Sequence, residues 1–570
     1  MEQLRTDVLV IGSGGAGMRA AMAASEAGAD VLVLSKGKCG LSGATVTASA
    51  DVNCDSRSIL DVLGYDGDPD DTMEAFFEDT VSGGKYLNDA RLVETLVTDA
   101  PARVKELIDW GARVKRVYQT PGHRTKRGLW VDGRNYAMTV LKQMRKHPVK
   151  TRDNCAVIDL AVKDGQVCGA YAVDLETGEY LVVSAKAVVL ASGGAMNIFN
   201  VSTACTELYG DGQAMALRAG AALTDMEFPM YLLGCGGPPA AEGMNFTFAI
   251  MNQCGAHLLN RLGQRYMQKW DPERMEHSTR DTLIVAATTE ILEGRGSPNG
   301  GVWVSLRHLP RGLIDHFFEW YGEWTDMPSD QYECFKIADL FPDLDGGGIE
   351  ARPSAHYWNG GVVIDRDGRT TLPGLFAAGE VTGGVHGANR LSGNAMLEIL
   401  VFGERSGKAA AAFAKSERAP TPDDNCNAFD FSESLFADGT PDESVLDIRK
   451  RLTATAWEVI GPVRTEAGLK KANDIATDVK EKLPSLRLAH KGRVFNREWM
   501  DAMSLRSIAD MFRMSSEAGL LRTESRGSHF RREFPESDEA AWRKNIILTE
   551  RNGSIECAVT PVHAKKGGTA

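Results

Sequence analysis

Three short runs of apolar residues, far apart in the chain, end at glycine-rich turns and predict buried strands of one sheet. They are residues 6–11 (TDVLVI), 187–191 (AVVLA) and 375–378 (LFAA). Continuous apolar runs of this length are typical of parallel strands covered on both faces. Because long segments separate the runs, we expect an α/β chain (α+β overall) whose first domain is discontinuous, with a second domain inserted in it.

The first run continues into a βαβ unit. Residues 18–27 are rich in alanine and predict a helix, and residues 30–34 (DVLVL) predict a second strand. The turn at residues 12–17 reads GSGGAG, a GxGxxG pattern in its full βαβ context. In this pattern the first glycine allows the tight turn, the second lets the backbone approach a pyrophosphate, and the third lets helix and strand pack closely. Backbone amides at the start of the helix then bind the phosphate charge.

The end of the second strand argues against a simple nicotinamide dehydrogenase. Ser35 and Lys36 stand where NAD-binding units usually have a carboxylate for the ribose hydroxyls. A serine hydroxyl can still bond a ribose, so a dinucleotide site is still expected. The missing acid and the two additional strand ends favour a two-domain flavoprotein.

The composition of the chain disfavours several kinds of partner, location and metal site. The 570 residues include 64 Lys and Arg against 77 Asp and Glu, a net charge of -13, which disfavours nucleic acid or anionic lipid as a partner. No apolar run approaches the ~18 residues of a membrane span and no signal peptide is visible, so we expect a cytoplasmic protein without membrane insertion, at most peripheral to a membrane through a partner. Ten cysteines occur without a CxxC pair, so no metal or iron–sulfur site is expected in this chain.

Several longer segments match one family in the family's own order. They are DVLVIGSGGAGMRAA, YGDGQAMALRAGA, STRDTLIVAATTEILEGRG, RPSAHYWNGGVVID, LPGLFAAGEVTGGVHGANRLSGNAMLE and TESRGSHFRREFPE. Together they resemble the flavoprotein subunits of fumarate reductase and succinate dehydrogenase, with L-aspartate oxidase and adenylylsulfate reductase as relatives. The resemblance extends from about residue 5 to about residue 545.

This resemblance implies a Rossmann-like FAD-binding domain, an inserted capping domain that closes over the flavin, and a C-terminal helical domain. The expected boundaries are 1–225 and 354–418 for the FAD domain, 226–353 for the cap, 419–444 for an acidic linker, 445–535 for the helical domain and 536–570 for a C-terminal segment. A helix predicted from residue 394 would direct its N-terminal amides at the flavin. The residues implied in FAD binding are Gly12, Gly14, Gly15, Gly17, Ser35, Lys36, Ser42, Gly43, Thr45, Gly194, Asp211, Glu380, Ala395 and Met396.

The resemblance also assigns three catalytic residues. In the family an arginine delivers a proton to one substrate carbon while flavin passes a hydride to its neighbour, and Arg280 occupies that position. His356 and Arg390 match the residues that hold a substrate carboxylate or carbonyl oxygen. An arginine, with a pKa above about 12, can act as an acid only in a dry site facing a strongly basic carbanion. On spacing alone, structural ion pairs or a buried histidine would explain these residues, and the surrounding motifs favour catalysis.

Two departures from the family pattern change the expected cofactor link and substrate. The covalent flavin bond needs a histidine where Gly43 or Ala44 stands here, so FAD is expected to be non-covalent, which by analogy favours a reductase. The second carboxylate clamp of the dicarboxylate enzymes is also missing, because 232–234 read Leu-Leu-Gly and 248–249 read Phe-Ala. A buried carboxylate without partners is strongly disfavoured. We therefore expect an enoate or an enoyl or aryl thioester as substrate, rather than fumarate, succinate or aspartate.

The basic residues near the C-terminus bear on the partner. Arg522, Arg526, His529, Arg531 and Arg532 interrupt an otherwise acidic chain. They predict either a solvated face of the helical domain or, from the resemblance, a contact with another subunit. Because this chain has no cluster motif, electrons are expected to pass through a separate iron–sulfur or other redox subunit.

Three functions remain in competition. The leading one is an FAD-dependent oxidoreductase that acts on a carbon–carbon bond next to a carboxylate or thioester carbonyl and uses a redox partner. One alternative is an oxidase of the aspartate-oxidase kind, which passes electrons to oxygen. The other is an electron-transferring flavoprotein subunit with a closed substrate pocket, which the joint presence of Arg280, His356 and Arg390 disfavours. Direct reduction by NADH stays open, although only one full GxGxxG unit is present.

Overall fold

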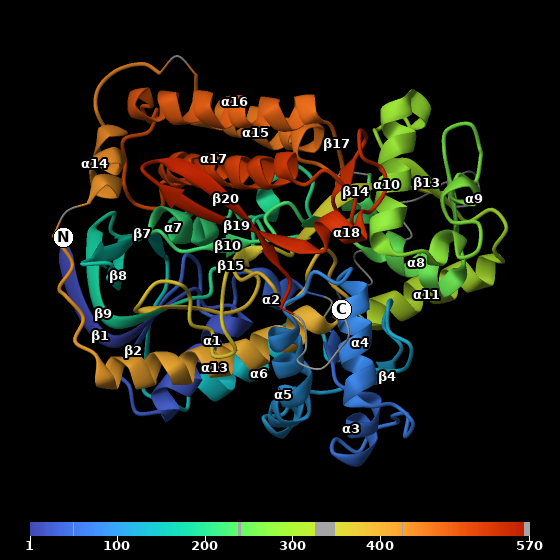
Figure 1. Ribbon diagram of the computed structural model, residues 1–570, viewed down its shortest axis with the longest axis horizontal. Coiled ribbons are helices and arrows are strands. Elements are labelled where there is room, and N and C mark those ends of the chain that lie inside the picture. Colours follow the sequence, from blue (N-terminus) through green and yellow to red (C-terminus); the bar gives the residue numbers. More distant parts are fainter. Residues whose placement is uncertain (49–50, 238–240, 325–347, 425, 442, 564–570) are drawn as a thin grey trace.

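The computed structural model describes residues 1–48, 51–237, 241–324, 348–424, 426–441 and 443–563 (Figure 1). Its main sheet has the order β6-β2-β1-β9-β8-β7, with β16 paired to β9. β1 pairs in parallel with β2 and β9, and β9 pairs in parallel with β16. The three apolar runs therefore lie side by side, as predicted. The strands are β1 (Glu2–Ile11), β2 (Val31–Leu34), β6 (Val149–Arg152), β7 (Cys155–Lys163), β8 (Gln166–Asp174), β9 (Tyr180–Leu190) and β16 (Leu375–Ala377).

Two helices from opposite ends of the FAD-binding domain pack together below this sheet (Figure 1). They are α1 (Gly15–Glu26) and α13 (Asn394–Ser416). Glycine in α13 makes the contact close, since a Cβ at Gly407 would lie only 2.2 Å from the carbonyl oxygen of Ala20. The same domain also contains α2 (Ala44–Thr47), α3 (Ser56–Asp61), α4 (Met73–Gly83), α5 (Ala90–Asp109), α6 (Gly133–Met144), α7 (Asp211–Arg218) and a small sheet of β3 (Asp51–Asn53), β5 (Gly128–Trp130) and β4 (Arg116–Tyr118).

The inserted domain lies on one side of the molecule, at the right of Figure 1. Its antiparallel sheet has the order β11-β14-β13-β12, and β14 returns the chain to the FAD-binding domain. Its elements are β11 (Pro229–Cys235), α8 (Phe246–Cys254), β12 (His257–Leu259), α9 (Met267–Trp270), α10 (Arg280–Glu290), β13 (Val302–Ser305), α11 (Arg311–Trp324) and β14 (Ile349–Trp358).

The C-terminal part forms the upper layer of the molecule in Figure 1. Its last hairpin returns to the FAD-binding domain, because β19 pairs with β10 in a sheet of order β15-β10-β19-β20. No helix among the described residues is long and apolar enough to cross a membrane. The sheet that the hairpin joins includes β10 (Leu223–Thr224) and β15 (Gly361–Val362) of the FAD-binding domain. The elements of the C-terminal part itself are α14 (Asn427–Ser434), α15 (Val445–Val459), β17 (Val463–Arg464), α16 (Glu466–Lys482), α17 (Arg497–Leu521), β18 (Phe530–Arg531), α18 (Glu539–Trp542), β19 (Lys544–Arg551) and β20 (Ser554–Pro561).

The basic C-terminal segment is not a surface strip, so the prediction of a solvated or partner-binding face was wrong. Arg522, Arg526, His529 and Arg531 are all buried, and only Arg532 is exposed. The Arg522 Nε donates to Glu227 Oε1 at 2.8 Å, and its Nη1 donates to Glu524 Oε1 at 3.0 Å. These acidic partners, one of them almost three hundred residues away in sequence, neutralise the buried cations.

Candidate active site

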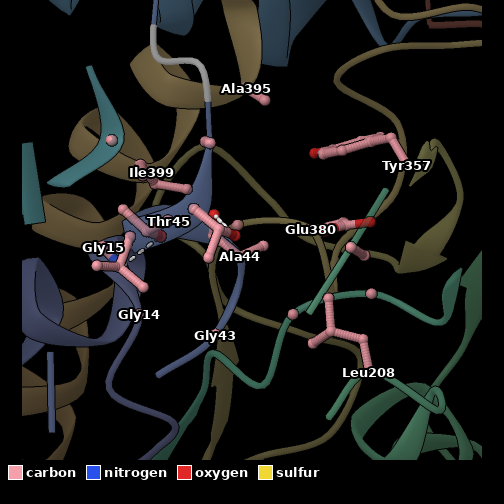
Figure 2. A pocket seen from close by; sticks show the side chains of 18 of the residues that line it. Gly14, Gly15, Gly43, Ala44, Thr45, Leu208, Tyr357, Glu380, Ala395 and Ile399 are labelled. Carbon is pink, nitrogen blue, oxygen red and sulfur yellow. Dashed lines mark hydrogen bonds between the residues drawn. The ribbon is translucent and has the colours of Figure 1, made fainter. Parts of the chain in front are cut away.

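A cavity of about 610 Å³ opens at the carboxyl ends of the central strands, between the FAD-binding domain and the cap (Figure 2). This is where open parallel sheets bind their ligands. Gly17, alone of the residues predicted to bind cofactor or substrate, does not line it. The predicted residues that do are Gly12, Gly14, Gly15, Ser35, Lys36, Ser42, Gly43, Thr45, Gly194, Asp211, Arg280, His356, Glu380, Arg390, Ala395 and Met396.

The glycines in and near the first turn have two different roles. Some allow close packing, and others border open space in the cavity. A Cβ at Gly17 would lie 2.0 Å from the carbonyl oxygen of Gly12, so Gly17 allows the close βα packing predicted for the third glycine. A Cβ at Gly14 would meet only Thr45 Oγ1, at 3.5 Å, and one at Gly43 would meet nothing within 4 Å. The backbone at Gly14 and Gly43 therefore faces open space, as a cofactor-binding cradle requires. Thr45 holds this region by accepting a hydrogen bond from the Gly15 amide at 3.0 Å (Figure 2).

Charged residues close the cavity at the end of the second strand. Lys36 Nζ forms an ion pair with Asp211 Oδ2 at 3.1 Å, although the two residues come from distant segments. Burial opposes the charged form of Lys36, but Asp211 outweighs it, so its pKa lies above the usual value. Ser35 Oγ and Ser13 Oγ are 2.6 Å apart. Ser35, Lys36 and Asp211 thus form one polar group at this end, suited to ribose and phosphate oxygens.

Glu380 lines the same cavity (Figure 2). It accepts a hydrogen bond from the backbone amide of Trp358 at 3.0 Å. A Cβ at Gly194 would lie 2.1 Å from its Oε1, so the glycine leaves room for the Glu380 side chain in this position. Burial raises the pKa of Glu380 to about 7, against the opposing effects of the Trp358 amide and Arg390.

The N-terminus of α13 faces the same cavity, as the sequence predicted. Ser392, Gly393, Ala395 and Met396 line it. Asn53 of β3 fixes this turn by donating from Nδ2 to the Ser392 carbonyl oxygen at 2.6 Å and to Asn394 Oδ1 at 2.8 Å. The positive end of a long helix is therefore directed into the cavity.

The three predicted catalytic residues meet at the cap side of the cavity. Arg280 begins α10; its Nη2 donates to Ser392 Oγ at 3.3 Å and its guanidinium lies 4.9 Å from the centre of the Phe248 ring. Arg390 lies 4.5 Å above the Tyr357 ring. Arg280 Nε and Nη1 and Arg390 Nε are buried and have no hydrogen-bond partner among the described residues. Unpaired buried donors of this kind are suited to bind an anionic or carbonyl oxygen.

The local electrostatics suit Arg280 to proton donation. Burial, with a further contribution from the charge of Arg390, lowers its pKa to about 9, while Asp51 opposes the shift. His356 donates or accepts at Nδ1 with Thr203 Oγ1, 2.7 Å away. Burial, followed by the charges of Arg390 and Arg280, puts the pKa of His356 well below its usual value, so the ring is neutral. Two cations and a neutral imidazole thus meet at one place.

Sequence analysis missed Asp51 and Tyr118, which line the cavity beside Arg280. Asp51 Oδ1 accepts a hydrogen bond from the Tyr118 hydroxyl, and Oδ2 accepts one from Ser392 Oγ at 3.4 Å. Burial raises the pKa of Asp51 to about 6, while Tyr118, Arg280, Ser392 and Arg390 oppose the rise. Neither residue belongs to a recognisable motif, so only the small sheet that joins β3, β5 and β4 brings them together.

Apart from Arg280, the cap contributes no charged residue to the cavity among its described residues. Its other contributions are apolar or neutral, with Leu232 and Phe248 where the dicarboxylate enzymes were expected to have their second clamp. Between residues 226 and 353 they are Leu232, Gly243, Met244, Asn245, Phe248, Ala249, Asn252 and Gln253, and the end of β14 adds His356 and Tyr357. In the described chain, no cluster of three or more His, Cys, Asp or Glu is placed to hold a metal ion.

Fold and cavity together define an FAD-dependent oxidoreductase. The family model described as "FAD binding domain" matches residues 7–396, and the one described as "Fumarate reductase flavoprotein C-term" matches residues 449–567. The chain belongs to the family of fumarate reductase and succinate dehydrogenase flavoproteins.

Individual relatives agree with this family over nearly their whole length. The chain is 36% identical to one of the subunits of fumarate reductase (CoM/CoB) from Methanothermobacter marburgensis, covering 96% of this chain and 98% of that one. It is 33% identical to the fumarate reductase flavoprotein subunit of Mycobacterium tuberculosis, covering 98% and 97%. Among solved structures, E. coli quinol fumarate reductase FrdA superposes with a TM-score of 0.86 at 27% identity, covering 100% and 99%.

Proposed function

We propose that this flavoprotein moves a hydride between FAD and a carbon–carbon bond adjacent to a carboxylate or thioester carbonyl. The observation that carries the proposal is the convergence of Arg280, His356 and Arg390 on one end of the cavity, with buried N–H donors left unpaired among the described residues. FAD supplies the hydride or accepts it. FAD is held non-covalently, since Gly43 and Ala44 offer no side chain that could form a bond to it.

The protein residues divide the remaining work. Arg390 and neutral His356 bind the substrate carboxylate or carbonyl oxygen, which draws electron density from the adjacent double bond. Arg280 donates the proton to the second carbon, and its lowered pKa makes this transfer easier. Phe248, against which Arg280 packs, keeps water from the guanidinium.

The charge balance supports a substrate with a single carboxylate or a thioester carbonyl. Arg280 and Arg390 bring two positive charges to the reacting end, and the Asp51 carboxylate offsets one of them. On the cap side of the cavity, a second substrate carboxylate would meet the apolar Leu232 and Phe248 and the negative Asp51 rather than a dedicated cationic clamp. An enoate or an enoyl or aryl thioester avoids this cost.

We further propose that electrons reach the FAD through a separate iron–sulfur subunit. Relatives that are themselves named as subunits of fumarate reductase support this arrangement. The described part of the chain has no cluster of His, Cys, Asp or Glu that could hold a metal centre in place of such a partner.

The direct test is anaerobic reoxidation of the dithionite-reduced holoprotein by cinnamate, crotonyl-CoA and fumarate. We expect the first two to reoxidise the flavin and fumarate to do so far more slowly at equal millimolar concentration. Arg280→Ala should retain FAD and lose about 10²–10⁴-fold in rate, the usual range for a general acid. The exposed Arg57→Ala is the matched control and should match the wild type.

Each competing function has its own result in this assay. Fumarate as the best acceptor would contradict the single-carboxylate proposal. Rapid, stoichiometric hydrogen peroxide formation in air, without a faster organic acceptor, would favour an oxidase. Undiminished electron throughput in Arg280→Ala would favour an electron-transfer role in which the cavity is not used for catalysis.

A further inference from the structure

Asp51 and Tyr118 form a hydrogen-bonded pair that lines the cavity. The roles proposed above for substrate binding do not fully explain why this pair is there. Asp51 lies in β3 and is 7% exposed, and Tyr118 ends β4. Both carboxylate oxygens of Asp51 have partners, the Tyr118 hydroxyl on one and Ser392 Oγ on the other. An acid this buried, in contact with neutral hydroxyls on both oxygens, is placed to exchange protons in both directions.

The pair is connected to the proposed proton donor. Arg280 Nη2 donates to Ser392 Oγ at 3.3 Å, and Ser392 Oγ donates to Asp51 Oδ2 at 3.4 Å. The other guanidinium nitrogens, Nε and Nη1, have no partner among the described residues. Ser392 is therefore the hydrogen-bonded contact through which Arg280 reaches another titratable group.

The geometry of this connection is fixed by the fold. Asn53, two residues after Asp51 on the same strand, holds the Ser392 carbonyl oxygen at 2.6 Å. The strand therefore positions the acid and the serine together. At the outer end, Tyr118 is only half-buried, and the guanidinium of Arg116 lies 4.6 Å from its ring centre. The path thus leads from Arg280 through Ser392 and Asp51 to the partly exposed Tyr118 at the end of β4.

We propose that Asp51 is a proton-relay residue that, through Ser392, returns to Arg280 the proton that Arg280 gives to the substrate carbon, with Tyr118 linking Asp51 to solvent. The proposal rests on the proposed function. Arg280 loses one of its two Nη2 protons to carbon and becomes neutral, which leaves a lone pair on Nη2. The Ser392 hydroxyl gives its proton to Arg280 Nη2 and takes one from protonated Asp51. Tyr118 then gives its proton to the Asp51 carboxylate and takes one from water, so one proton enters per turnover and no electron moves along the path.

The charged and titratable groups that face Asp51 are consistent with this role. They are Arg280 of α10, Arg390 of the segment before α13 and Tyr118 of β4, with the Ser392 hydroxyl completing the set. Burial raises the pKa of Asp51 to about 6 despite these groups, so both protonation states are accessible near neutral pH. In the reducing direction Asp51 must be protonated, so turnover should fall as pH rises through that value.

The test compares Asp51→Asn, Ser392→Ala and Tyr118→Phe with the wild-type holoprotein, using reduced methyl viologen as donor and cinnamate, crotonyl-CoA or fumarate as acceptor. We expect Asp51→Asn and Ser392→Ala to lower kcat at least about tenfold without raising the KM for the acceptor, a loss of ~1.4 kcal/mol in barrier. The solvent deuterium isotope effect on kcat should rise, and the fall of kcat above about pH 6 should disappear. Asp51→Glu should restore part of the rate.

Asp61→Asn makes the same chemical change at an exposed position on α3 and serves as the control. Wild-type kcat, pH profile and isotope effect in both Asp51→Asn and Ser392→Ala would overturn the relay alone. If the wild type reduces none of the three acceptors, the proposed function is wrong and the relay falls with it. Should Asp51→Asn not fold or not retain FAD, Ser392→Ala and Tyr118→Phe decide the outcome, because they leave the charge of the site unchanged.

Discussion

Single residues in the first turn differ in their surroundings, since one is tightly packed and another faces the cavity. Gly17 is in contact with the Gly12 carbonyl, whereas Gly14 faces the cavity. The same chemical change at these two positions should therefore have different consequences. The GxGxxG spacing predicted both roles, since each glycine in that pattern answers a local backbone requirement.

Gly17→Ala should destabilise the apoprotein by about 1–3 kcal/mol, because its Cβ would lie 2.0 Å from a backbone oxygen that cannot move aside. Gly14→Ala should leave the apoprotein close to wild type, since its Cβ meets only Thr45 Oγ1 at 3.5 Å, but weaken FAD binding about tenfold or more. Thermal unfolding of the apoprotein and titration with FAD measure the two effects.

Gly312→Ala is the control for this pair, because a Cβ there meets nothing within 4 Å in helix α11. It should be neutral or stabilising by up to ~1 kcal/mol through helix propensity. Equal losses of stability in Gly14→Ala and Gly17→Ala would contradict the division of roles.

At the scale of elements, the apolar runs predicted where the strands lie but underestimated how long they are. β1 extends from Glu2, and β9 from Tyr180, several residues before the apolar runs begin. These outer residues pair with each other across the sheet, Glu2 with Leu181, and partly exposed positions there tolerate polar side chains. In β1 the outer positions alternate in exposure, and in β9 the more exposed Ser184 and Lys186 interrupt a buried apolar segment, so neither strand is one continuous apolar run.

A buried ion pair formed by the loop after α17 connects two parts of the molecule, and substitutions in this pair measure its contribution to stability. Arg522 and Glu227 have fully buried side chains and connect the helical domain to the start of the cap. We expect Arg522→Met to destabilise the protein by about 3–5 kcal/mol, because it leaves Glu227 charged and without its partner. Chemical denaturation monitored by flavin and tryptophan fluorescence measures this loss.

The double variant Arg522→Met/Glu227→Gln should recover much of that stability, since no unpaired charge remains. Arg57→Ala, which removes an ion pair whose side chains are 62% and 56% exposed, should cost only ~0–1 kcal/mol. A similar cost for Arg522→Met would show that Glu227 finds another partner or a proton.

At the scale of the whole molecule, the last hairpin of the chain pairs with a strand of the FAD-binding domain. β19 pairs with β10, and its Ile546 and Leu548 are completely buried. A chain ending at residue 543 should therefore unfold at lower temperature, with each buried side chain worth about 1.5–3 kcal/mol. A chain ending at residue 563 keeps every described pairing and is the control; equal unfolding temperatures would exclude a structural role for the hairpin.

The sequence by itself determined whatever depends on neighbours along the chain. It identified the glycine-rich turn, the three strand ends and Arg280, His356 and Arg390 as residues that line one cavity, because each lies in a local pattern or a family motif. It interpreted the basic segment wrongly because Glu227 is distant along the chain.

The tertiary structure alone decided which distant groups share a low-dielectric environment. It placed Asp51 beside Arg280 and buried the Arg522 cluster, and in both cases the charge balance of the site follows from that proximity. Local spacing fixes backbone conformation, but charge, burial and hydrogen bonding act through space, so their effects appear only once the chain is folded.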